Sequence, residues 1–366
     1  MMFVVIISFY VVMLLLVMAG FVVHPNDTKC DDQHQKVSVI IAARNEEATI
    51  ANCIESIASQ KYSKELVEII VIDDASTDTT FGKAAAALEA SGIKHLIILN
   101  EEHNGKKASL RRGIAACNSE IIICRDADTF TVSNNWLSSI VNYMAATKKE
   151  FVICPIAIDH KKGILSSLQE TEMTILSLFT VSSAYFNVPF LANGANLAFT
   201  KKLFYAAGAY QEHLHIASGD DVFFLEKVKQ MDVNKIGYLK NKDAIAYTFP
   251  EKRLSELIHQ KIRWSSKLFK NPSVINWLSA LIISTTNFVW IGATFYAIFN
   301  PKNLPVSLIF ILSKLLIDIL LVFLASSFIK VKTGALGVAV MAFIYPFYAS
   351  LIAILTVFVK PKWKNN

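Results

Sequence analysis

Four long apolar runs restrict the folds that are open to this chain of 366 residues. The first run, Met1 to Val23, carries no charged side chain, and the others follow Pro272 as residues 274–299, 306–329 and 336–359. About 20 consecutive apolar residues suffice for a helix to cross a bilayer. We therefore expect a multi-pass membrane protein whose polar chemistry lies between the first run and the second.

The flanks of the apolar runs predict the orientation. A cleavable signal peptide has a cationic start and a small-residue cleavage site, and residues 1–23 have neither, so we interpret them as an uncleaved anchor. Cations near span ends favour the cytoplasm. They cluster before the second run: Lys252, Arg253, Lys261, Arg263, Lys267 and Lys270.

This cluster places the middle of the chain in the cytoplasm and the protein in the inner (plasma) membrane. Four complete spans would then put the basic tail KPKWKNN outside, against the same rule, so one segment that does not cross fully stays an alternative. The basic flanks also account for the pI near 8.9, and we expect no nucleic acid as a partner.

Two charged residues stand inside the third apolar run. Lys314 and Asp318 are four residues apart, so they share a helix face, where we expect an ion pair that faces protein. Helix packing and a function in the membrane are both open roles. The cysteines show no CxxC or metal-like spacing and are expected to be reduced, partly buried thiols: Cys30, Cys53, Cys117, Cys124 and Cys154.

The middle of the chain alternates between strand and helix patterns. Apolar strands are expected in VSVIIAAR, LVEIIVIDD, HLIILN and EIIICRD, and helices are expected between them. The first helix has Ile50, Cys53, Ile54 and Ile57 at helical spacing, and another spans Lys106 to Ala116. The fold class is therefore α/β: a Rossmann-like, mostly parallel sheet with helices on both faces, plus transmembrane helices.

Polar side chains follow several of these strands. They are Arg44, Asn45 and Glu46 after the first strand, Asp73 and Asp74 after the second, and Asp126 and Asp128 after the fourth. In such sheets ligands bind outside the carboxyl ends of the strands. Carboxylates gathered there repel one another without a cation, and Mg²⁺ or Mn²⁺ shared with substrate phosphates is the usual solution. The alternatives are a solvated turn at Asp126 and Asp128, and a helix cap after Asp74.

Seven stretches in order resemble the signature blocks of family 2 glycosyltransferases. They are VSVIIAARNEEATI, EIIVIDDASTDTT, NGKKASLRRGI, CRDADTF, LANGANLAF, SGDDVFFLEKV and QKIRW. The resemblance is strongest to the membrane-bound branch with cellulose, chitin, hyaluronan and poly-N-acetylglucosamine synthases and ceramide glucosyltransferase. It runs from about Val37 to Trp264 and implies a GT-A fold.

The resemblance also implies residue roles in binding a UDP-sugar. Asp128 would coordinate the metal at the diphosphate, and Asp126 would approach the ribose or the metal. Lys106 matches the lysine of the family's GKA block, in which Lys107 replaces the usual alanine. The donor-binding residues that the resemblance implies are Ala43, Glu46, Asp73, Asp74, Lys106, Asp126, Gln260 and Arg263.

The family's acidic pair corresponds to Asp220 and Asp221, and the resemblance makes Asp221 the catalytic base. An acceptor hydroxyl is a poor nucleophile until a carboxylate takes its proton. The alternative role of Asp221 is a cap for the helix that follows. Asn193 and Gly194 match a turn near the donor sugar and the acceptor, and the alternative is an ordinary glycine turn.

The last block is Gln-x-x-Arg-Trp. On a helix Gln260, Arg263 and Trp264 share one face. Arg263 can grip a diphosphate with two parallel hydrogen bonds, and Trp264 offers an aromatic wall for a sugar ring of the acceptor. An amphipathic helix on the membrane surface is the alternative, and both roles are compatible.

Together these observations predict a membrane-bound inverting glycosyltransferase that uses a UDP-sugar and a divalent metal. The acceptor would be a polysaccharide or a lipid-linked glycan, and export would call for accessory subunits. Non-processive glycolipid synthesis is the alternative, followed by an inactive nucleotide-binding membrane protein. The expected divisions are an anchor at 1–23, a cytoplasmic GT-A domain at 37–250, an interfacial helix at 251–271 and about three transmembrane helices at 272–359.

Overall fold

The computed structural model describes residues 2–26, 35–210, 220–266, 274–300, 302 and 304–359. The chain divides into two compact units. The α/β unit comprises His24–Ala157 and Ser183–Phe249. The helical unit comprises Met1–Val23, Ile158–Ser182 and Pro250–Asn366.

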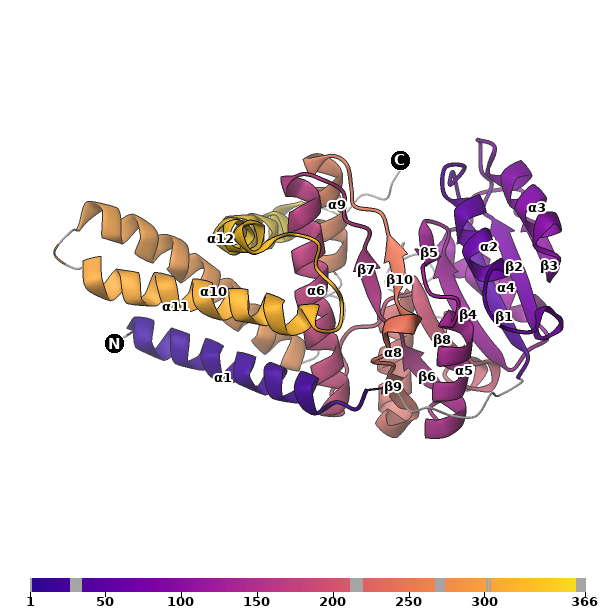
Figure 1. The fold of residues 1–366 in the computed structure, drawn as a ribbon, viewed down its shortest axis with the longest axis horizontal. Coiled ribbons are helices and arrows are strands. Elements are labelled where there is room, and N and C mark those ends of the chain that lie inside the picture. Colours follow the sequence, from indigo (N-terminus) through magenta and orange to yellow (C-terminus); the bar gives the residue numbers. More distant parts are fainter. Residues whose placement is uncertain are drawn as a thin grey trace. The chain divides into compact units, whose positions relative to one another are not determined.

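A large mixed sheet forms the centre of the α/β unit (Figure 1). In the described part of the chain it has seven strands in the order β3-β2-β1-β4-β8-β6-β9. The first four strands in this order are parallel, β8 is antiparallel to both neighbours, and β9 is parallel to β6. The strands are β1 (Val37–Ala43), β2 (Val67–Asp73), β3 (Lys94–Leu99), β4 (Ile121–Asp126), β6 (Phe151–Ile153), β8 (Asn196–Thr200) and β9 (Ile236–Tyr238).

A smaller sheet and several helices complete this unit. The smaller sheet has the order β5-β10-β7. Its strands are β5 (Thr129–Thr131), β7 (Ile156–Ile158) and β10 (Ala246–Thr248). The helices are α2 (Ile50–Ala58), α3 (Thr80–Ser91), α4 (Lys106–Ala116), α5 (Trp136–Thr147), α7 (Lys201–Ala206) and α8 (Asp220–Asp232).

The strand and helix patterns of the sequence explain this packing. Alternate residues of β1 face opposite sides, so Val39 and Ile41 join the core cluster that contains Ile54 of α2, whereas Ile40 lies under α4. Helices therefore cover both faces, as predicted. The expected burial of Cys53, Cys117, Cys124 and Cys154 as reduced thiols is confirmed, and Cys30 lies outside the described residues.

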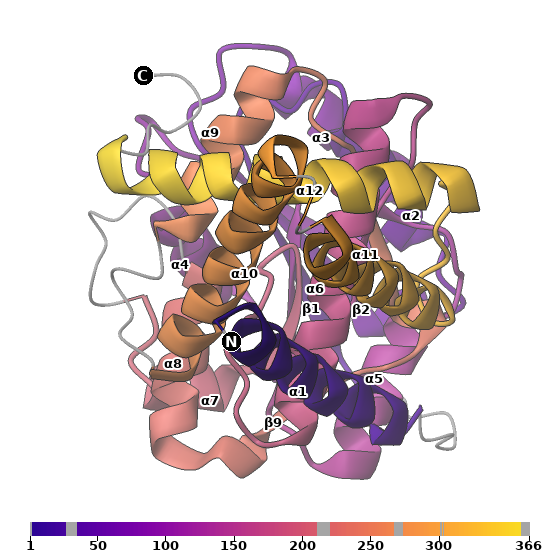
Figure 2. The same cartoon turned by 90° about the vertical axis from the view of Figure 1, so that its left-hand side faces the viewer.

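The helical unit contains the helices long and apolar enough to cross a membrane. Among the described residues there are four such segments: Val5–Val23, Asn276–Phe299, Leu304–Ser326 and Ala335–Phe358. They belong to α1 (Met2–Val23), α10 (Val274–Phe299), α11 (Leu304–Ser326) and α12 (Ala335–Phe358). Figure 2 shows α12 crossing α10 rather than running along it. Two further helices of this unit are α6 (Ile164–Tyr185) and α9 (Leu254–Ser265).

The predicted ion pair inside α11 is confirmed. Lys314 Nζ lies 2.5 Å from Asp318 Oδ2, and Tyr10 Oη of α1 donates a hydrogen bond of 2.6 Å to Asp318 Oδ1. All three side chains are buried in the helical unit. A charge in an apolar bundle is costly unless it is paired, so this cluster ties α1 to α11.

The close approach of α4 to the sheet generates a stability prediction. A Cβ atom on Gly113 would lie 2.5 Å from Ile72 Cδ1 and 2.7 Å from Ile40 Cγ2, both in the buried sheet. Gly113→Ala should therefore lower the free energy of unfolding by about 1–3 kcal/mol, as overpacking usually does. Gly82→Ala in α3 is the control, because nothing lies within 4 Å of its Cβ. Urea melts that find the two variants equally stable would contradict this packing.

Candidate functional site

The parallel strands bring the predicted acids to one edge of the sheet. Strand β1 lies between β2 and β4 and ends at Ala43, whose partner in β2 is Asp73, and Ala42 is the partner of Asp126 in β4. The carbonyl oxygen of Ala43 accepts a hydrogen bond of 2.8 Å from the backbone N–H of Asp74. These residues therefore share the carboxyl edge of the sheet, where the sequence placed them.

Two loops at this edge are locked together. Asn45 adopts a positive φ of 53°, its N–H donates to Ser76 Oγ at 3.0 Å, and its Oδ1 accepts from the N–H of Thr77 at 2.9 Å. The N–H of Glu46 donates to Thr80 Oγ1 at 2.8 Å. Glu46 is thus fixed beside the start of α3, close in the chain to the end of β1.

Asp73 has one carboxylate oxygen that the described residues leave without a hydrogen bond. Its Oδ1 accepts from the N–H of Ser76 at 2.7 Å, while Oδ2 is buried with no partner in that part of the chain. A buried acceptor without a partner costs about 1–3 kcal/mol. Oδ2 of Asp73 is therefore a candidate acceptor for an N–H group of a ligand.

Asp74 organises the loop between β3 and α4. Its Oδ1 accepts from Asn100 Nδ2 at 2.8 Å and from the N–H of Asn104 at 2.9 Å. Its Oδ2 accepts from His103 Nδ1 at 2.6 Å and from the N–H of Gly105 at 2.9 Å. Burial by itself raises the pKa of Asp74, but these hydrogen bonds outweigh it, and the pKa lies below its ordinary value.

One cation of the chain pairs with Asp126, and a second, Arg125, lies buried next to it in the sequence. Lys106, the first residue of α4, places Nζ 2.5 Å from Asp126 Oδ1. Arg125 is fully buried, donates to Thr129 Oγ1 and lies 4.6 Å from the ring centre of Trp136. Burial lowers the pKa of Arg125, and the nearby carboxylates of Asp126 and Asp128 are among the groups that oppose this shift.

The donor set at this edge fits a metal ion that is shared with a substrate. No group of three His, Cys, Asp or Glu side chains in the described residues is arranged to hold a metal ion. Mg²⁺ is usually bound through one or two carboxylates plus substrate phosphates rather than by a cage made of protein alone. Asp126 and Asp128 supply two such carboxylates, and both are partly exposed.

Asp221 joins the same edge through the antiparallel strand. Strand β8 begins at Asn196, which pairs with Arg125 near the end of β4, so the residues just before β8 lie at the carboxyl edge of β4. The N–H of Gly194 donates to Asp221 Oδ2 at 3.1 Å, and the N–H of Val222 donates to Asp221 Oδ1 at 2.8 Å. The structure therefore brings together the Gly194 turn and Asp221.

The turn before β8 is held by its own amide. Asn193 Oδ1 accepts from the N–H of Ala195 at 3.1 Å, and its carbonyl accepts from the N–H of Asn196 at 3.1 Å. The backbone of Asp220 begins α8, but its side chain and residues 218–219 lie outside the described parts of the chain.

The Gln-x-x-Arg-Trp residues belong to the helical unit. Gln260, Arg263 and Trp264 all lie on α9, as predicted. Gln260 Nε2 donates to Glu251 Oε1 at 2.8 Å, and Arg263 and Trp264 are half-buried.

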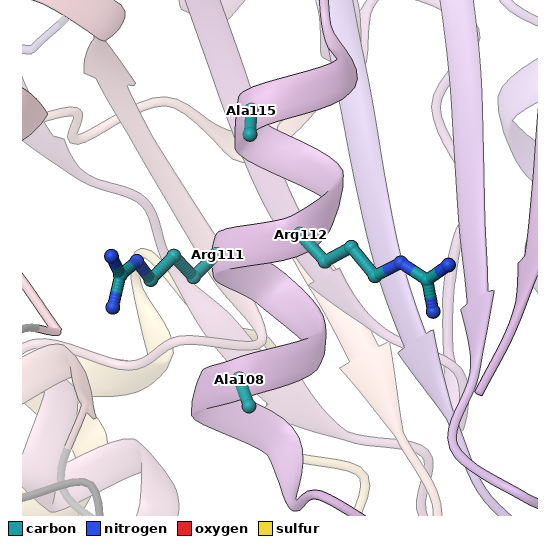
Figure 3. A pocket seen from close by; sticks show the side chains of 4 residues that line it. All are labelled: Ala108, Arg111, Arg112 and Ala115. Atoms are coloured by element: carbon teal, nitrogen blue, oxygen red, sulfur yellow. The ribbon is translucent and has the colours of Figure 1, made fainter. Parts of the chain in front are cut away.

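A shallow pocket on α4 is separate from the residues described above. Ala108, Arg111, Arg112 and Ala115 line it, and the two arginines extend to opposite sides of the helix (Figure 3). Arg112 Nη1 donates to Asn100 Oδ1 at 2.6 Å, so its role is to support the loop that Asp74 organises.

Sequence reasoning missed three residues of this region: Arg125, His103 and Asn196. An arginine inside the apolar run IIICRD was a signal, because a buried cation needs partners. Asn196 binds Trp136 Nε1 through its Oδ1 at 3.1 Å, and its amide donates to the carbonyls of Pro155 and Ala244. No local pattern marks an asparagine whose partners lie 41 to 60 positions away.

Comparison with known families decides the classification. The family model described as "Glycosyl transferase family 2" matches residues 38–223, more than half of the 366 residues. The chain belongs to glycosyl transferase family 2. The predicted family is thus confirmed, and the matched range contains the carboxyl edge with Asp73, Asp126 and Asp221.

Curated relatives of this family 2 member match over part of its length. The poly-beta-1,6-N-acetyl-D-glucosamine synthase of Staphylococcus aureus (strain COL) is 28% identical over 145 residues, 40% of this chain and 34% of that protein. Glycosyltransferase AglE of Haloferax volcanii is 27% identical over 192 residues, 52% of this chain and 60% of that protein. The chain thus matches about a third of the synthase's length.

A solved structure of similar fold covers nearly the whole chain. The mannosyltransferase PcManGT from Pyrobaculum calidifontis, solved with GDP-Man and Mn²⁺, aligns over 98% of both chains with a TM-score of 0.60 and 17% identity. At this identity the likeness concerns the fold. The GT-A fold with its parallel-rich sheet and apolar helices, predicted from the sequence, is confirmed.

The hydrogen bonds of Asp74 predict a pH-dependent contribution to stability. Asp74→Asn puts an amide where four donors converge, so the variant should be less stable than the parent at pH 7. Because the folded pKa of Asp74 is lowered, its contribution is complete above about pH 4 and is lost as the pH falls through the folded pKa. Melting curves from pH 7 to pH 3 should show the difference narrowing in acid. Asp232→Asn at the far end of α8 is the control, and a difference that stays constant in acid would refute the assignment.

Proposed function

We propose that this protein is a membrane-bound inverting glycosyltransferase that moves a sugar from a UDP-sugar to a polysaccharide or lipid-linked acceptor. The observation that carries the proposal is the convergence of Asp73, Asp126 and Asp221 on one edge of the sheet within the matched family range. Asp73 offers an acceptor oxygen for the donor, and Asp126 with Asp128 offers two carboxylates for a metal ion. Asp221, held by backbone N–H groups, offers a carboxylate that can activate the acceptor.

Asp221 is suited to act as the base. The N–H groups of Gly194 and Val222 donate to its two carboxylate oxygens. As the base, the carboxylate would take the proton of an acceptor hydroxyl as the hydroxyl oxygen attacks the anomeric carbon. The two backbone donors fix the carboxylate in place, which serves the orientation that general base catalysis needs.

The donor would bind along the carboxyl edge. In this assignment Asp73 Oδ2 accepts an N–H of the base, Ala43 and Glu46 border the nucleoside, and Asp74 shapes the loop that presents Lys106. Lys106 would face the diphosphate, and Gln260 and Arg263 on α9 of the helical unit are the further residues assigned to donor binding. A divalent Mg²⁺ or Mn²⁺ ion held by Asp126 and Asp128 would stabilise the negative charge of the leaving diphosphate.

The acceptor side of the proposal rests on Asn193, Gly194 and Trp264. The turn at Asn193 and Gly194 adjoins Asp221, and Trp264 offers an aromatic face of the kind that sugars stack on. Asp220 is kept as the second acid of the pair. A growing polysaccharide and a single lipid-linked acceptor remain the two acceptor classes, and accessory export subunits belong to the first.

A panel of donors tests the function directly. Purified membranes are incubated with labelled UDP-N-acetylglucosamine, UDP-glucose, UDP-galactose and GDP-mannose, and the products are separated by size and by lipid extraction. A ladder identifies a polysaccharide synthase, and a single lipid-soluble product identifies glycolipid synthesis. Transfer from GDP-mannose alone would overturn the donor class, and no transfer from any donor would favour the inactive nucleotide-binding alternative.

If Asp221 is the base, its substitution should affect turnover but not the affinity for UDP. Asp221→Asn should keep the affinity for UDP nearly unchanged, because the base contributes mainly in the transition state, and turnover should fall about 100-fold or more. Calorimetric titration of UDP and saturated rates measure the two effects. Asp232→Asn at the other end of α8 controls for the loss of an acid, and an Asp221→Asn variant with normal turnover would leave Asp221 as a helix cap.

The orientation in the membrane gives another prediction. The apolar helices would cross the inner membrane with the α/β unit in the cytoplasm, because cations gather just before α10. Since α12 lies across α10, it is the candidate for the segment that does not cross fully (Figure 2). Glu102 is exposed on a loop of that unit. A membrane-impermeant maleimide should therefore label Glu102→Cys after lysis and spare it in intact cells, with the parent protein as the background control. Labelling in intact cells would reverse the orientation.

A further inference from the structure

One face of α6 reaches two residues of the Gln-x-x-Arg-Trp helix. Gln169 and Glu172 are three residues apart on α6 and so share a face. Gln169 exchanges two hydrogen bonds with the backbone of Glu251: its Oε1 accepts from the N–H at 2.8 Å, and its Nε2 donates to the carbonyl at 3.1 Å. The side chain of Glu251 then accepts from Gln260 Nε2 at 2.8 Å.

The second connection runs through a buried lysine inside the motif. Lys261 is 7% exposed, and its Nζ lies 2.6 Å from Glu172 Oε2. The same Nζ lies 4.4 Å from the ring centre of Trp264. A cation over an indole face is attracted to it, so the ammonium holds the ring on one side while Glu172 holds the ammonium.

Lys261 is not an ordinary surface lysine with its ammonium in water. Lysine is almost never fully buried unless it is paired, and an ordinary amphipathic helix would direct this ammonium to water. Here it reaches Glu172 of α6 and is buried, and α6 and α9 also share an apolar cluster that contains Leu168 and Leu257. The buried ion pair of Lys261 with Glu172 therefore lies at the position that contacts the ring of Trp264.

We propose that Glu172 and Lys261 are positioning residues for acceptor binding: the pair fixes the plane of Trp264 so that its open face is presented to a sugar ring. The proposal rests on the proposed function in assigning Trp264 to the acceptor. The orientation of the ring by Glu172 and Lys261 does not depend on that assignment.

Four variants of the full-length protein separate positioning from general stability. Lys261→Met removes the cation but keeps most of the side-chain length, and Lys261→Arg keeps a cation over the ring. Glu172→Gln combined with Lys261→Met removes both charges, so no buried charge is left without a partner. Lys252→Met, on an exposed lysine just before α9, is the matched control.

Three measurements are needed. The protein is labelled with 5-fluorotryptophan, and the fluorine resonance of Trp264 is assigned by its loss in Trp264→Phe. Initial rates are measured with UDP-N-acetylglucosamine as the donor and an N-acetylglucosamine oligosaccharide as the acceptor. Melting temperatures are recorded for every variant, so that a loss of fold is recognised.

The expected pattern is specific to positioning. Lys261→Met should shift or broaden the Trp264 resonance and raise the acceptor KM on the order of 10-fold, with the donor KM unchanged. Lys261→Arg should keep the Trp264 resonance and the acceptor KM close to those of the parent protein. Lys252→Met should change neither quantity. The double variant should recover the melting temperature without recovering the acceptor KM.

Three results would overturn the proposal. The first is an unmoved Trp264 resonance in Lys261→Met, and the second is a double variant that recovers the acceptor KM together with its stability. The third is a donor KM that rises as much as the acceptor KM. If the parent protein shows no transfer, the proposed function fails for this donor and acceptor, and the fluorine resonance alone then decides whether Glu172 and Lys261 orient Trp264.

Discussion

The buried guanidinium of Arg125 is the interaction on which the arrangement of the carboxyl edge depends. An arginine without compensation in a core costs several kcal/mol, so its partners must form together with the sheet. Thr129 accepts hydrogen bonds from its Nε and Nη2, the ring of Trp136 lies 4.6 Å away, and Nη1 has no partner in the described residues. Thr129 Oγ1 also donates to the carbonyl of Asp126, so the residue that holds Arg125 also braces the turn between β4 and β5.

Trp136, the ring beside Arg125, also contacts the first residue of the antiparallel strand β8. Trp136 donates to Asn196, the first residue of β8, and Asn196 in turn binds the carbonyls of Pro155 and Ala244. The start of β8 is therefore fixed beside the end of β4. An antiparallel strand begins at the edge where its parallel neighbours end, so the turn before it, with Gly194, delivers Asp221 to the same edge as Asp73 and Asp126.

The sequence predicted the parts of this arrangement that depend on local patterns. Strands β1 to β4 are mostly apolar runs, and α4 has the bounds that were expected from the sequence, because local apolar patterns mark such elements. The three-residue strands β6, β7 and β9 and the long helix α6 were not predicted. They are too short, or too polar on their buried face, for periodicity to reveal, and their positions follow from partners far away in the chain. Asp74 was predicted as a site residue, but its hydrogen-bond partners were not, because they lie on a loop 26 to 31 residues away.

The charges at the carboxyl edge change the reason for expecting a metal ion there. Converging acids pointed to a divalent cation, but Lys106 pairs with Asp126 and the buried Arg125 is its neighbour in the sequence, so the chain itself brings positive charge to this edge. The acids are therefore partly balanced by the chain itself. A diphosphate donor, as proposed, would bring new negative charge to the same edge, where Lys106 is already paired with Asp126. A divalent ion would thus be required by the substrate more than by the protein, which is consistent with a site that offers two carboxylates rather than a complete cage.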